Sequence, residues 1–170
     1  MRIREAVLTD ARMIARIHVR AWQWAYRGQL SDGYLDDLRP EERLELHRRS
    51  LEESPPEVRT WVAEDEGSVV GFAVTGPSED ADADQRTGEV YAIYLEPDRV
   101  GTGVGRELFQ HAIGDLRDRG FSAVTLWVLE TNELARRFFE RAGWRFDGTT
   151  TSERVDCEMR PTVRYRAALA

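Results

Sequence analysis

The chain has 170 residues, a formal net charge of -7 at pH 7, 41% hydrophobic residues and 32% charged residues. This size and balance predict one soluble globular domain over residues 1–170 and exclude a disordered or fibrous protein. The negative charge argues against nucleic acid or an anionic membrane as the main partner, and it favours a cationic substrate such as an amine.

The sequence also disfavours targeting segments and metal or disulfide sites. The opening residues, MRIREAVLTDARM, carry charges throughout, and no apolar run approaches the roughly 20 residues that cross a bilayer, so we expect a cytoplasmic protein. Cys157 is the only cysteine, and we expect it to be a small, partly buried residue. No His, Cys, Asp and Glu residues have metal-ligand spacing, so no metal is predicted.

The N-terminal region predicts an edge strand followed by a helix. Arg2–Ala6 is the expected strand, and Thr9 or Asp10 can cap a helix that Gly28 ends. His18 lies on this helix, where we expect a surface or hydrogen-bonded histidine rather than a catalytic one. The apolar positions at helical spacing are Met13, Ile14, Ile17 and Ala21.

The next segment predicts a second helix and then two strands. Pro40 suits the first turn of this helix, which the Ser54-Pro55-Pro56 sequence breaks. Thr60–Ala63 and Ser68–Thr75 are the expected strands, and the polar, acidic stretch Pro77–Gly88 predicts an exposed, mobile hairpin loop. The helix has an apolar side formed by Leu44, Leu46 and Leu51, while His47, like His111 farther along, falls on a polar helix face without a predicted role.

The second half predicts alternating strands and helices. A strand over Val90–Leu95 precedes a glycine-rich loop and an amphipathic helix that Gly120 ends, and Ala123–Leu129 is a strand buried on both faces. A last strand carries Val163 and Tyr165. Between these strands, Thr131 or Asn132 caps a helix whose expected inward residues are Leu134, Ala135, Phe138, Phe139 and Ala142. This order predicts an α/β fold with a single sheet and helices on both faces.

The segment EVYAIYLEPDRVGTGVGRELF, residues 89–109, carries the clearest functional signal. Gly101, Gly103 and Gly105 remove three Cβ atoms where the chain passes from strand to helix, so several backbone N–H groups can converge on one anion. A diphosphate-bearing ligand is therefore expected. Taken alone, the GTGVG sequence could also be an ordinary glycine-rich turn. Its glycine spacing differs from the G-x-G-x-x-G motif of dinucleotide-binding folds.

Two motifs in the second half resemble those of the GNAT superfamily, the acyl-CoA-dependent N-acyltransferases. In that family a central strand ends in a proline and a Q/R-x-x-G-x-G/A turn, which Pro97 and Gly103-Val104-Gly105 match, while Val100 stands where Gln or Arg is usual. The N-terminal strand and helix are similar too, so the resemblance spans nearly the whole chain. The second motif, an asparagine followed by A-x-x-F-Y and a Gly-aromatic pair, is matched by Asn132, Ala135, Phe138, Gly143 and Trp144.

The resemblance implies a mixed, mostly antiparallel central sheet and acetyl-CoA as the co-substrate. Backbone groups of the glycine loop would hold the diphosphate, and Asn132 would contact the pantetheine arm as well as capping its helix. The residues expected to contact the coenzyme are Ile93, Tyr94, Leu95, Val100, Gly101, Thr102, Gly103, Val104, Gly105, Asn132, Ala135, Phe138 and Phe139.

Acetylation of an amine requires a base, an oxyanion donor and a leaving thiolate. An alkylammonium has a pKa near ~10.4, so a carboxylate must help it lose a proton, and Glu89 at the start of the central strand is the candidate, with a solvated acid as the alternative. Strand alternation predicts that Glu89 and Tyr91 share a face with Ile93 and Leu95. The resemblance implies that the Leu95 N–H binds the oxyanion. Phe139 replaces the tyrosine that often protonates the thiolate, which leaves that role absent or assigned to water, Tyr91 or Tyr94.

The acceptor pocket is expected near Trp22, Trp24 and Tyr26, because three aromatic residues within five positions cannot all face inward on one helix. Trp22 and Tyr26 are the residues predicted to bind the substrate, which would be a small-molecule amine or a protein amino group. Because no side chain is positioned as a nucleophile for a covalent intermediate, we expect direct transfer of the acetyl group in a ternary complex. A non-catalytic acyl-CoA-binding module and a nucleotide-binding interaction domain are the competing hypotheses, and a homodimer through sheet edges or the tail is compatible with the sequence.

Overall fold

A computed structural model describes residues 1–169, in which seven strands form one sheet of order β1-β2-β3-β4-β5-β7-β6. The strands β4 and β5 pair in parallel, and every other neighbouring pair within the described residues is antiparallel. The predicted mixed, mostly antiparallel sheet is thus confirmed. The strands are β1 (Arg2–Glu5), β2 (Arg59–Asp65), β3 (Ser68–Pro77), β4 (Thr87–Leu95), β5 (Ala123–Leu129), β6 (Arg145–Val155) and β7 (Glu158–Ala168).

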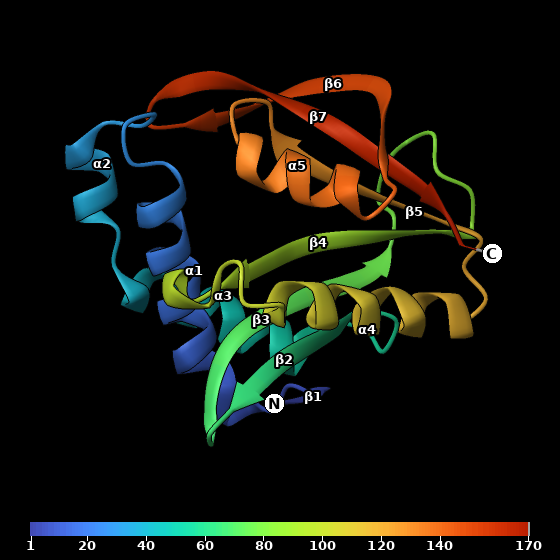
Figure 1. Ribbon diagram of the computed structural model, residues 1–170, viewed down its shortest axis with the longest axis horizontal. Helices are drawn as coiled ribbons and strands as arrows, with labels where there is room; N and C mark the ends of the chain where they lie inside the picture. The colour runs from blue at the N-terminus through green and yellow to red at the C-terminus, as the bar shows by residue number, and fades with distance from the viewer. Residues whose placement is uncertain (170) are drawn as a thin grey trace.

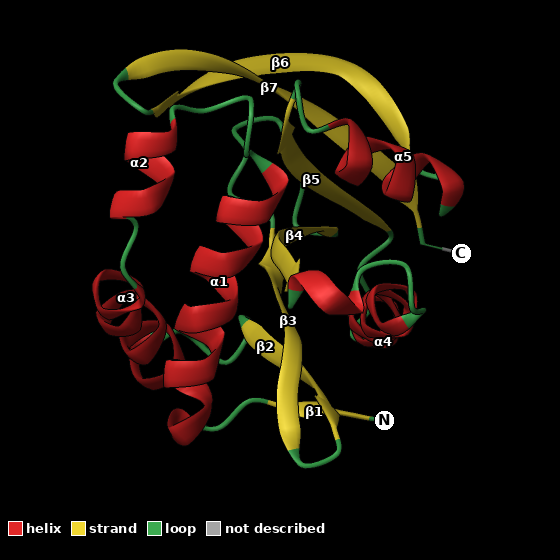
Figure 2. Ribbon diagram, turned by 60° about the vertical axis from the view of Figure 1, so that its left-hand side comes forward, coloured by secondary structure: helices red, strands yellow, loops and turns green. Residues whose placement is uncertain are grey.

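Helices cover both faces of this sheet, as the sequence predicted (Figures 1 and 2). One face carries α1 (Ala11–Ala25), α2 (Asp32–Asp37) and α3 (Pro40–Glu53), and the other carries α4 (Val104–Asp118) and α5 (Glu133–Arg141). Buried apolar side chains join each layer to the sheet. The first layer packs through Ile14 and Ile17 onto Val62 and Phe72, and the second packs through Leu108 and Ala112 onto Ala63 and Ala73.

Two elements, α2 and β6, have no counterpart in the sequence predictions. The α2 helix is a six-residue segment, DGYLDD, whose glycine and aspartates are poor helix formers. It is held in place because Leu35 is fully buried in a cluster with Tyr26 and Leu30. The β6 strand is an edge strand that is exposed over most of its length and lacks an apolar alternation, so it depends on its pairing with β7.

Several side chains lie where the sequence did not predict them. Leu46 and Leu134 were expected to face inward but are 53% and 51% exposed, and Ala142 is exposed as well. Cys157 is also exposed rather than partly buried, because it sits at φ 60° in the turn between β6 and β7. His47 is buried instead of lying on a polar surface, since a side chain from α1 supplies its hydrogen-bond partner.

A bulge in β4 changes which of its residues share a face. Val90 pairs with Thr75 and Ala92 with Val74, so β4 contains one more residue than β3 at this point. Val90 packs against α4, whereas Ala92 belongs to the cluster on the α1 side. The expectation that Glu89 shares a face with Ile93 and Leu95 is therefore wrong, because alternation from Val90 points Glu89 toward the α1 side of the sheet.

The parallel strands β4 and β5 separate after a short pairing. Their register runs from Thr87 opposite Ala123 to Val90 opposite Leu126 and ends there, although both strands continue. Figure 1 shows the two strands diverging toward α1. This separation leaves the rest of β4 without a strand on that side, and it connects the two faces of the sheet.

Candidate functional site

The loop before α4 presents backbone N–H groups to a large cavity. Gly101 and Gly103 have φ angles of 80° and 95°, in the left-handed region that glycine adopts without strain. The first bond along the helix runs from the Glu107 N–H to the Gly103 carbonyl, so the amides at positions 104–106 have no acceptor within the helix. The loop lines a cavity of about 1100 Å³, and its amides can bind an anion such as a diphosphate.

Arginine side chains surround the same cavity, and sequence reasoning did not identify them. Arg106 and Arg117 from α4 and Arg141 from α5 line it, and Arg137 lines the neighbouring cavity together with Arg141. The four-residue spacing of Arg137 and Arg141 places both on one face of α5, a signal that could have been noticed. By contrast, the Val104 side chain is buried in the core, so only its backbone faces the loop.

A narrower cavity of about 370 Å³ continues from this loop toward α1. Asn132 lines it and caps α5 as predicted: its Oδ1 accepts from the Ala135 N–H at 3.2 Å, and its Nδ2 donates to the Tyr26 hydroxyl at 3.0 Å. Tyr26 thereby bridges α1 and α5 across the separated strands. Other residues that were predicted to contact the coenzyme also line this cavity. They come from β4, the glycine loop and α5, and they are Ile93, Tyr94, Leu95, Val100, Gly101, Gly105, Ala135, Phe138 and Phe139.

The gap between β4 and β5 holds a third cavity, of about 120 Å³. Trp22, Tyr26 and Tyr91 line it with Ile93 and Phe139. The Glu96 N–H bonds the Val70 carbonyl on β3, and ladder bonds recur at every second residue, so the amides of Ile93 and Leu95 point away from β3 into the gap. The predicted oxyanion donor at Leu95 is therefore directed into this opening.

A buried aromatic and histidine cluster supports the α1 side of the gap. The Tyr94 hydroxyl accepts from Trp22 Nε1 at 3.1 Å, and the His18 ring stacks on Tyr94 with centroids 5.0 Å apart. His18 Nδ1 lies 2.9 Å from His47 Nε2. Burial lowers the pKa of His18 to about 3 and that of His47 to about 4, so both rings are neutral at pH 7. His18 thus has the hydrogen-bond partner that the sequence analysis expected.

Glu89 is a buried carboxyl group beside the gap. It is the third residue of β4 rather than the first, and it is 9% exposed. The Ser78 hydroxyl and the Glu79 N–H donate to its Oε2 at 3.2 and 3.3 Å. Burial, with the negative charge of Asp80, raises the pKa of Glu89 to about 6. Its neighbours Val90 and Tyr91 line the gap, so a water molecule could connect the carboxylate to an amine bound there.

Tyr91 does not offer a free proton. Its hydroxyl donates to the Pro77 carbonyl, and burial raises its pKa to about 12. This bond engages the hydroxyl hydrogen within the hairpin that joins β3 and β4. The prediction that Tyr91 can replace the missing tyrosine at position 139 is therefore not supported by its geometry.

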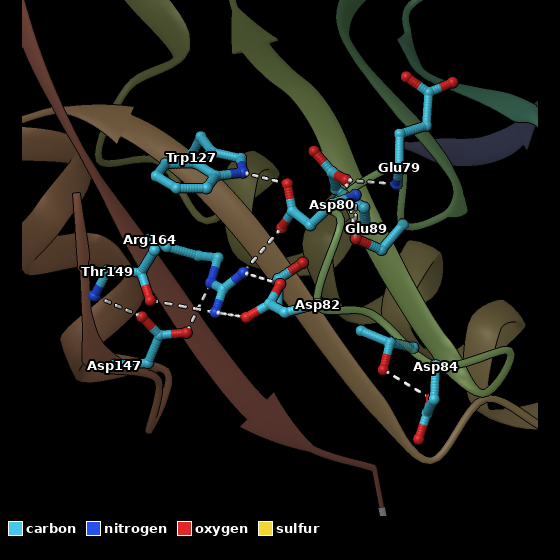
Figure 3. A network of polar contacts seen from close by, with 12 residues as sticks. Glu79, Asp80, Asp82, Asp84, Glu89, Trp127, Asp147, Thr149 and Arg164 are labelled. Carbon is cyan, nitrogen blue, oxygen red and sulfur yellow. Dashed lines mark hydrogen bonds and ion pairs between the residues drawn. The ribbon is translucent and has the colours of Figure 1, made fainter. Parts of the chain in front are cut away.

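The loop before β4 is largely exposed, as predicted, but Arg164 of β7 anchors it, so its contacts argue against the mobility that the sequence suggested (Figure 3). The guanidinium donates to Asp80 at 3.1 Å, to both oxygens of Asp82 at 2.7 Å and to Asp147 at 2.6 Å. Trp127 of β5 adds a bond from its Nε1 to Asp80 at 2.9 Å. These contacts fix the segment that supplies the Ser78 and Glu79 donors to Glu89. They were invisible in the sequence because they join residues between 17 and 84 positions apart.

Replacing Arg164 with methionine should lower the free energy of unfolding by about 3–5 kcal/mol, because it leaves three carboxylates together without their counter-ion. Urea denaturation measures this change. The control is Arg160→Met, since the ion pair of Arg160 with Glu158 is at the surface and should contribute less than about 1 kcal/mol. Equal losses in the two variants would contradict the anchoring role of Arg164.

A fourth cavity, of about 520 Å³, lies on the α1 side of β5, β6 and β7. It shares Trp127, Glu153 and Thr162 with the gap cavity, which in turn shares Tyr26 and Asn132 with the cavity toward the glycine loop. The cavities therefore adjoin one another in a series that runs from the amide-rich end of α4, through the separated strands, to the opposite face. Such a series can hold a long anionic ligand on one side and a second reactant on the other.

Two further properties follow from residues 1–169. In that part of the chain, no three His, Cys, Asp or Glu residues are placed to hold a metal ion together. None of the helices described there combines the length and the apolar character that a membrane crossing requires.

Comparison with known proteins agrees with this architecture. Residues 17–144 match the model of the acetyltransferase (GNAT) family. The uncharacterised N-acetyltransferase YuaI of Bacillus subtilis (strain 168) is 38% identical over 132 residues, which cover 76% of this chain and 72% of YuaI. The mycothiol acetyltransferase of Thermobispora bispora is 38% identical over 101 residues, which cover 59% of this chain but only 34% of that enzyme.

Solved structures show the same fold. The yncA protein of Salmonella typhimurium, determined with its cofactor acetyl-CoA, has a TM-score of 0.72 and 21% identity, and the match covers 100% of this chain and 94% of yncA. The family match extends over most of the chain and includes the glycine loop, the separated strands and the capped α5 helix. The chain therefore belongs to the acetyltransferase (GNAT) family and is an N-acetyltransferase.

Proposed function

We propose that this enzyme transfers the acetyl group of acetyl-CoA to a primary amine of a small molecule or protein, by direct attack in a ternary complex. The observation that carries the proposal is the series of adjoining cavities that crosses the sheet between β4 and β5. Its two ends differ in chemistry. Backbone amides and arginines surround one end, and the other end lies beside a buried carboxyl group, Glu89.

In this proposal the coenzyme occupies the side of α4 and α5. The amides at positions 104–106 bind the diphosphate together with loop amides of residues 101–105 other than that of Thr102, whose N–H donates to the Arg99 carbonyl. Arg106 and Arg141 support this binding, and Thr102 and Gly103 line the same cavity. The pantetheine arm follows the narrower cavity past Leu95 and Phe138 toward Asn132. Val100 contributes through its backbone, which explains how the site tolerates the absence of a Gln or Arg side chain there.

The chemistry takes place in the gap between the strands. Glu89, through water, removes a proton from the acceptor ammonium, whose pKa near ~10.4 would otherwise keep it protonated at pH 7. The free amine attacks the thioester carbon, so that an N–C bond forms and the carbonyl oxygen becomes negative. The Leu95 N–H stabilises that oxyanion, a contribution typically worth about 2.7–4 kcal/mol of barrier. The nitrogen, now positively charged, loses one proton to solvent as the C–S bond breaks and the carbonyl re-forms. Coenzyme A leaves as a thiolate that solvent protonates, because Phe139 has no proton to donate.

The direct test is to incubate the protein with acetyl-CoA, a panel of primary amines and a thiol reagent that detects free coenzyme A. We expect amine-dependent release of coenzyme A and formation of the N-acetyl product. Thermal unfolding with coenzyme A, NAD or ATP checks the cofactor separately, with stabilisation expected for coenzyme A. Binding of coenzyme A without release in the presence of any amine would favour the non-catalytic module instead.

A further inference from the structure

The cavity on the α1 side of β5, β6 and β7 has a negative lining. Its charged residues are Asp80, Asp82, Glu153 and Arg164, so three carboxylates face a single guanidinium. Asp147, which also binds Arg164, adds a further negative charge behind the lining. An anionic group entering this cavity would therefore meet uncompensated carboxylates, whereas a cation would be attracted.

Arg164 cannot act as a receptor for an anionic ligand. A guanidinium has five N–H donors, and the structure provides an acceptor for each of them. Nε binds Asp147, Nη1 binds Asp80 and Asp82, and Nη2 binds Asp82 and the Thr149 hydroxyl at 3.1 Å. The side chain is only 7% exposed. All five N–H donors of Arg164 therefore bind acceptors of the protein, and none remains for a ligand.

Two groups remain available to a ligand at the junction with the gap. Glu153 and Thr162 line both cavities. Glu153 is exposed, and no ion pair involves it within residues 1–169. The Thr162 hydroxyl oxygen belongs to a residue that is 4% exposed, and it has no hydrogen-bond partner in that described part. A buried polar atom without a hydrogen-bond partner lowers the stability of the folded protein. A ligand N–H that donates to the Thr162 hydroxyl oxygen would remove this free-energy cost and add a hydrogen bond.

We propose that the acceptor is an aliphatic diamine or longer polyamine, whose second, non-reacting ammonium group binds Glu153 and the Thr162 hydroxyl oxygen while the first amine reacts in the gap. This inference rests on the proposed transfer to an amine and defines its substrate class. Trp127 lies between the two cavities and supplies an apolar surface for the methylene chain. The nearby Asp82 adds to the attraction for the second charge.

The test compares three compounds of similar length with the same reacting amine: 1,4-diaminobutane, 1-aminobutane and 4-aminobutanoate. With saturating acetyl-CoA, we expect kcat/KM for the diamine to exceed that for the monoamine at least about tenfold, equivalent to about 1.4 kcal/mol. The amino acid should be the poorest of the three. Similar values for the diamine and the monoamine would overturn the proposal, as would a preference for 4-aminobutanoate.

Two variants locate the second ammonium. Glu153→Gln and Thr162→Val should each lower the ratio of diamine to monoamine kcat/KM, with the glutamine variant close to a ratio of one. The matched control is Glu45→Gln, because Glu45 is an exposed carboxylate of α3 that pairs with Arg48 and Arg49 and does not line either cavity, and its ratio should stay at the wild-type value. An unchanged ratio in Glu153→Gln would contradict the assignment.

Direct binding keeps this inference separate from the proposed reaction. Calorimetric titration of the same three compounds into the protein saturated with coenzyme A should give the tightest binding for the diamine and weaker binding of it to Glu153→Gln. Selective binding of the diamine without turnover would support the cation site and refute the transfer reaction. Turnover of all amines without selectivity would support the transfer reaction and refute the cation site.

Discussion

Replacing Glu89 with glutamine should lower kcat by about 10²–10⁴-fold, the usual contribution of a general base. The same change should alter the pH profile. Because burial raises the pKa of Glu89 to about 6, the wild-type rate should fall as the pH drops through 6 and the carboxylate becomes protonated. Glutamine cannot titrate, so this acidic limb should disappear. Steady-state rates between pH 5 and 9 measure both effects.

The control for this variant is Glu79→Gln. Glu79 is exposed and donates its backbone N–H to the Glu89 carboxylate, while its negative charge is a minor cause of the raised Glu89 pKa. Its substitution should therefore keep the rate and the acidic limb, with that limb moved slightly to lower pH. The Glu89→Gln substitution should not lower the free energy of unfolding, so a fall in rate would not reflect unfolding of the variant. A carboxyl group whose pKa is raised on folding destabilises the folded protein once ionised, and glutamine removes that charge. A normal rate in Glu89→Gln would remove this residue from the mechanism.

Replacing Gly103 with valine should abolish the stabilisation of the protein by coenzyme A. Gly103 has φ 95°, which a β-branched residue adopts at a cost of about 1–3 kcal/mol, so the loop would shift or strain. A Cβ at this position meets no protein atom within 4 Å, and Gly103 lines the cavity proposed for the diphosphate. The added side chain would therefore occupy ligand space. Thermal unfolding with and without coenzyme A is the measurement, and binding should weaken at least about tenfold.

Gly120→Val separates strain from lost binding. Gly120 has φ 93° and an equally open Cβ position, but it ends α4 at the opposite end from the glycine loop. Its valine variant should lose similar stability yet retain the shift with coenzyme A. If Gly103→Val still responded to coenzyme A like the wild type, the diphosphate would have to bind elsewhere.

Local signals in the sequence predicted much of the fold and the coenzyme half of the candidate site. The run over 123–129 matches β5, and Asn132 caps α5 as its position before an amphipathic segment indicated. The glycines at 101 and 103 adopt the left-handed angles that only glycine takes readily. These features depend on residues within a few positions of one another, which is why periodicity and turn chemistry could identify them.

The acceptor half depends on contacts between distant segments. A one-residue bulge turned Glu89 to the face opposite Ile93 and Leu95, and no alternation rule could have located that bulge. Arg164 joins Asp80 and Asp147 across the sheet. The β6 strand, which carries Glu153, has no apolar pattern of its own. The sequence by itself therefore determined most of the elements, though not α2 or β6, and the glycine loop proposed to bind the diphosphate, because those are local. Only the tertiary structure decided the surroundings of Glu89 and the charge of the cavity proposed for the acceptor, because these arise from long-range pairing and burial.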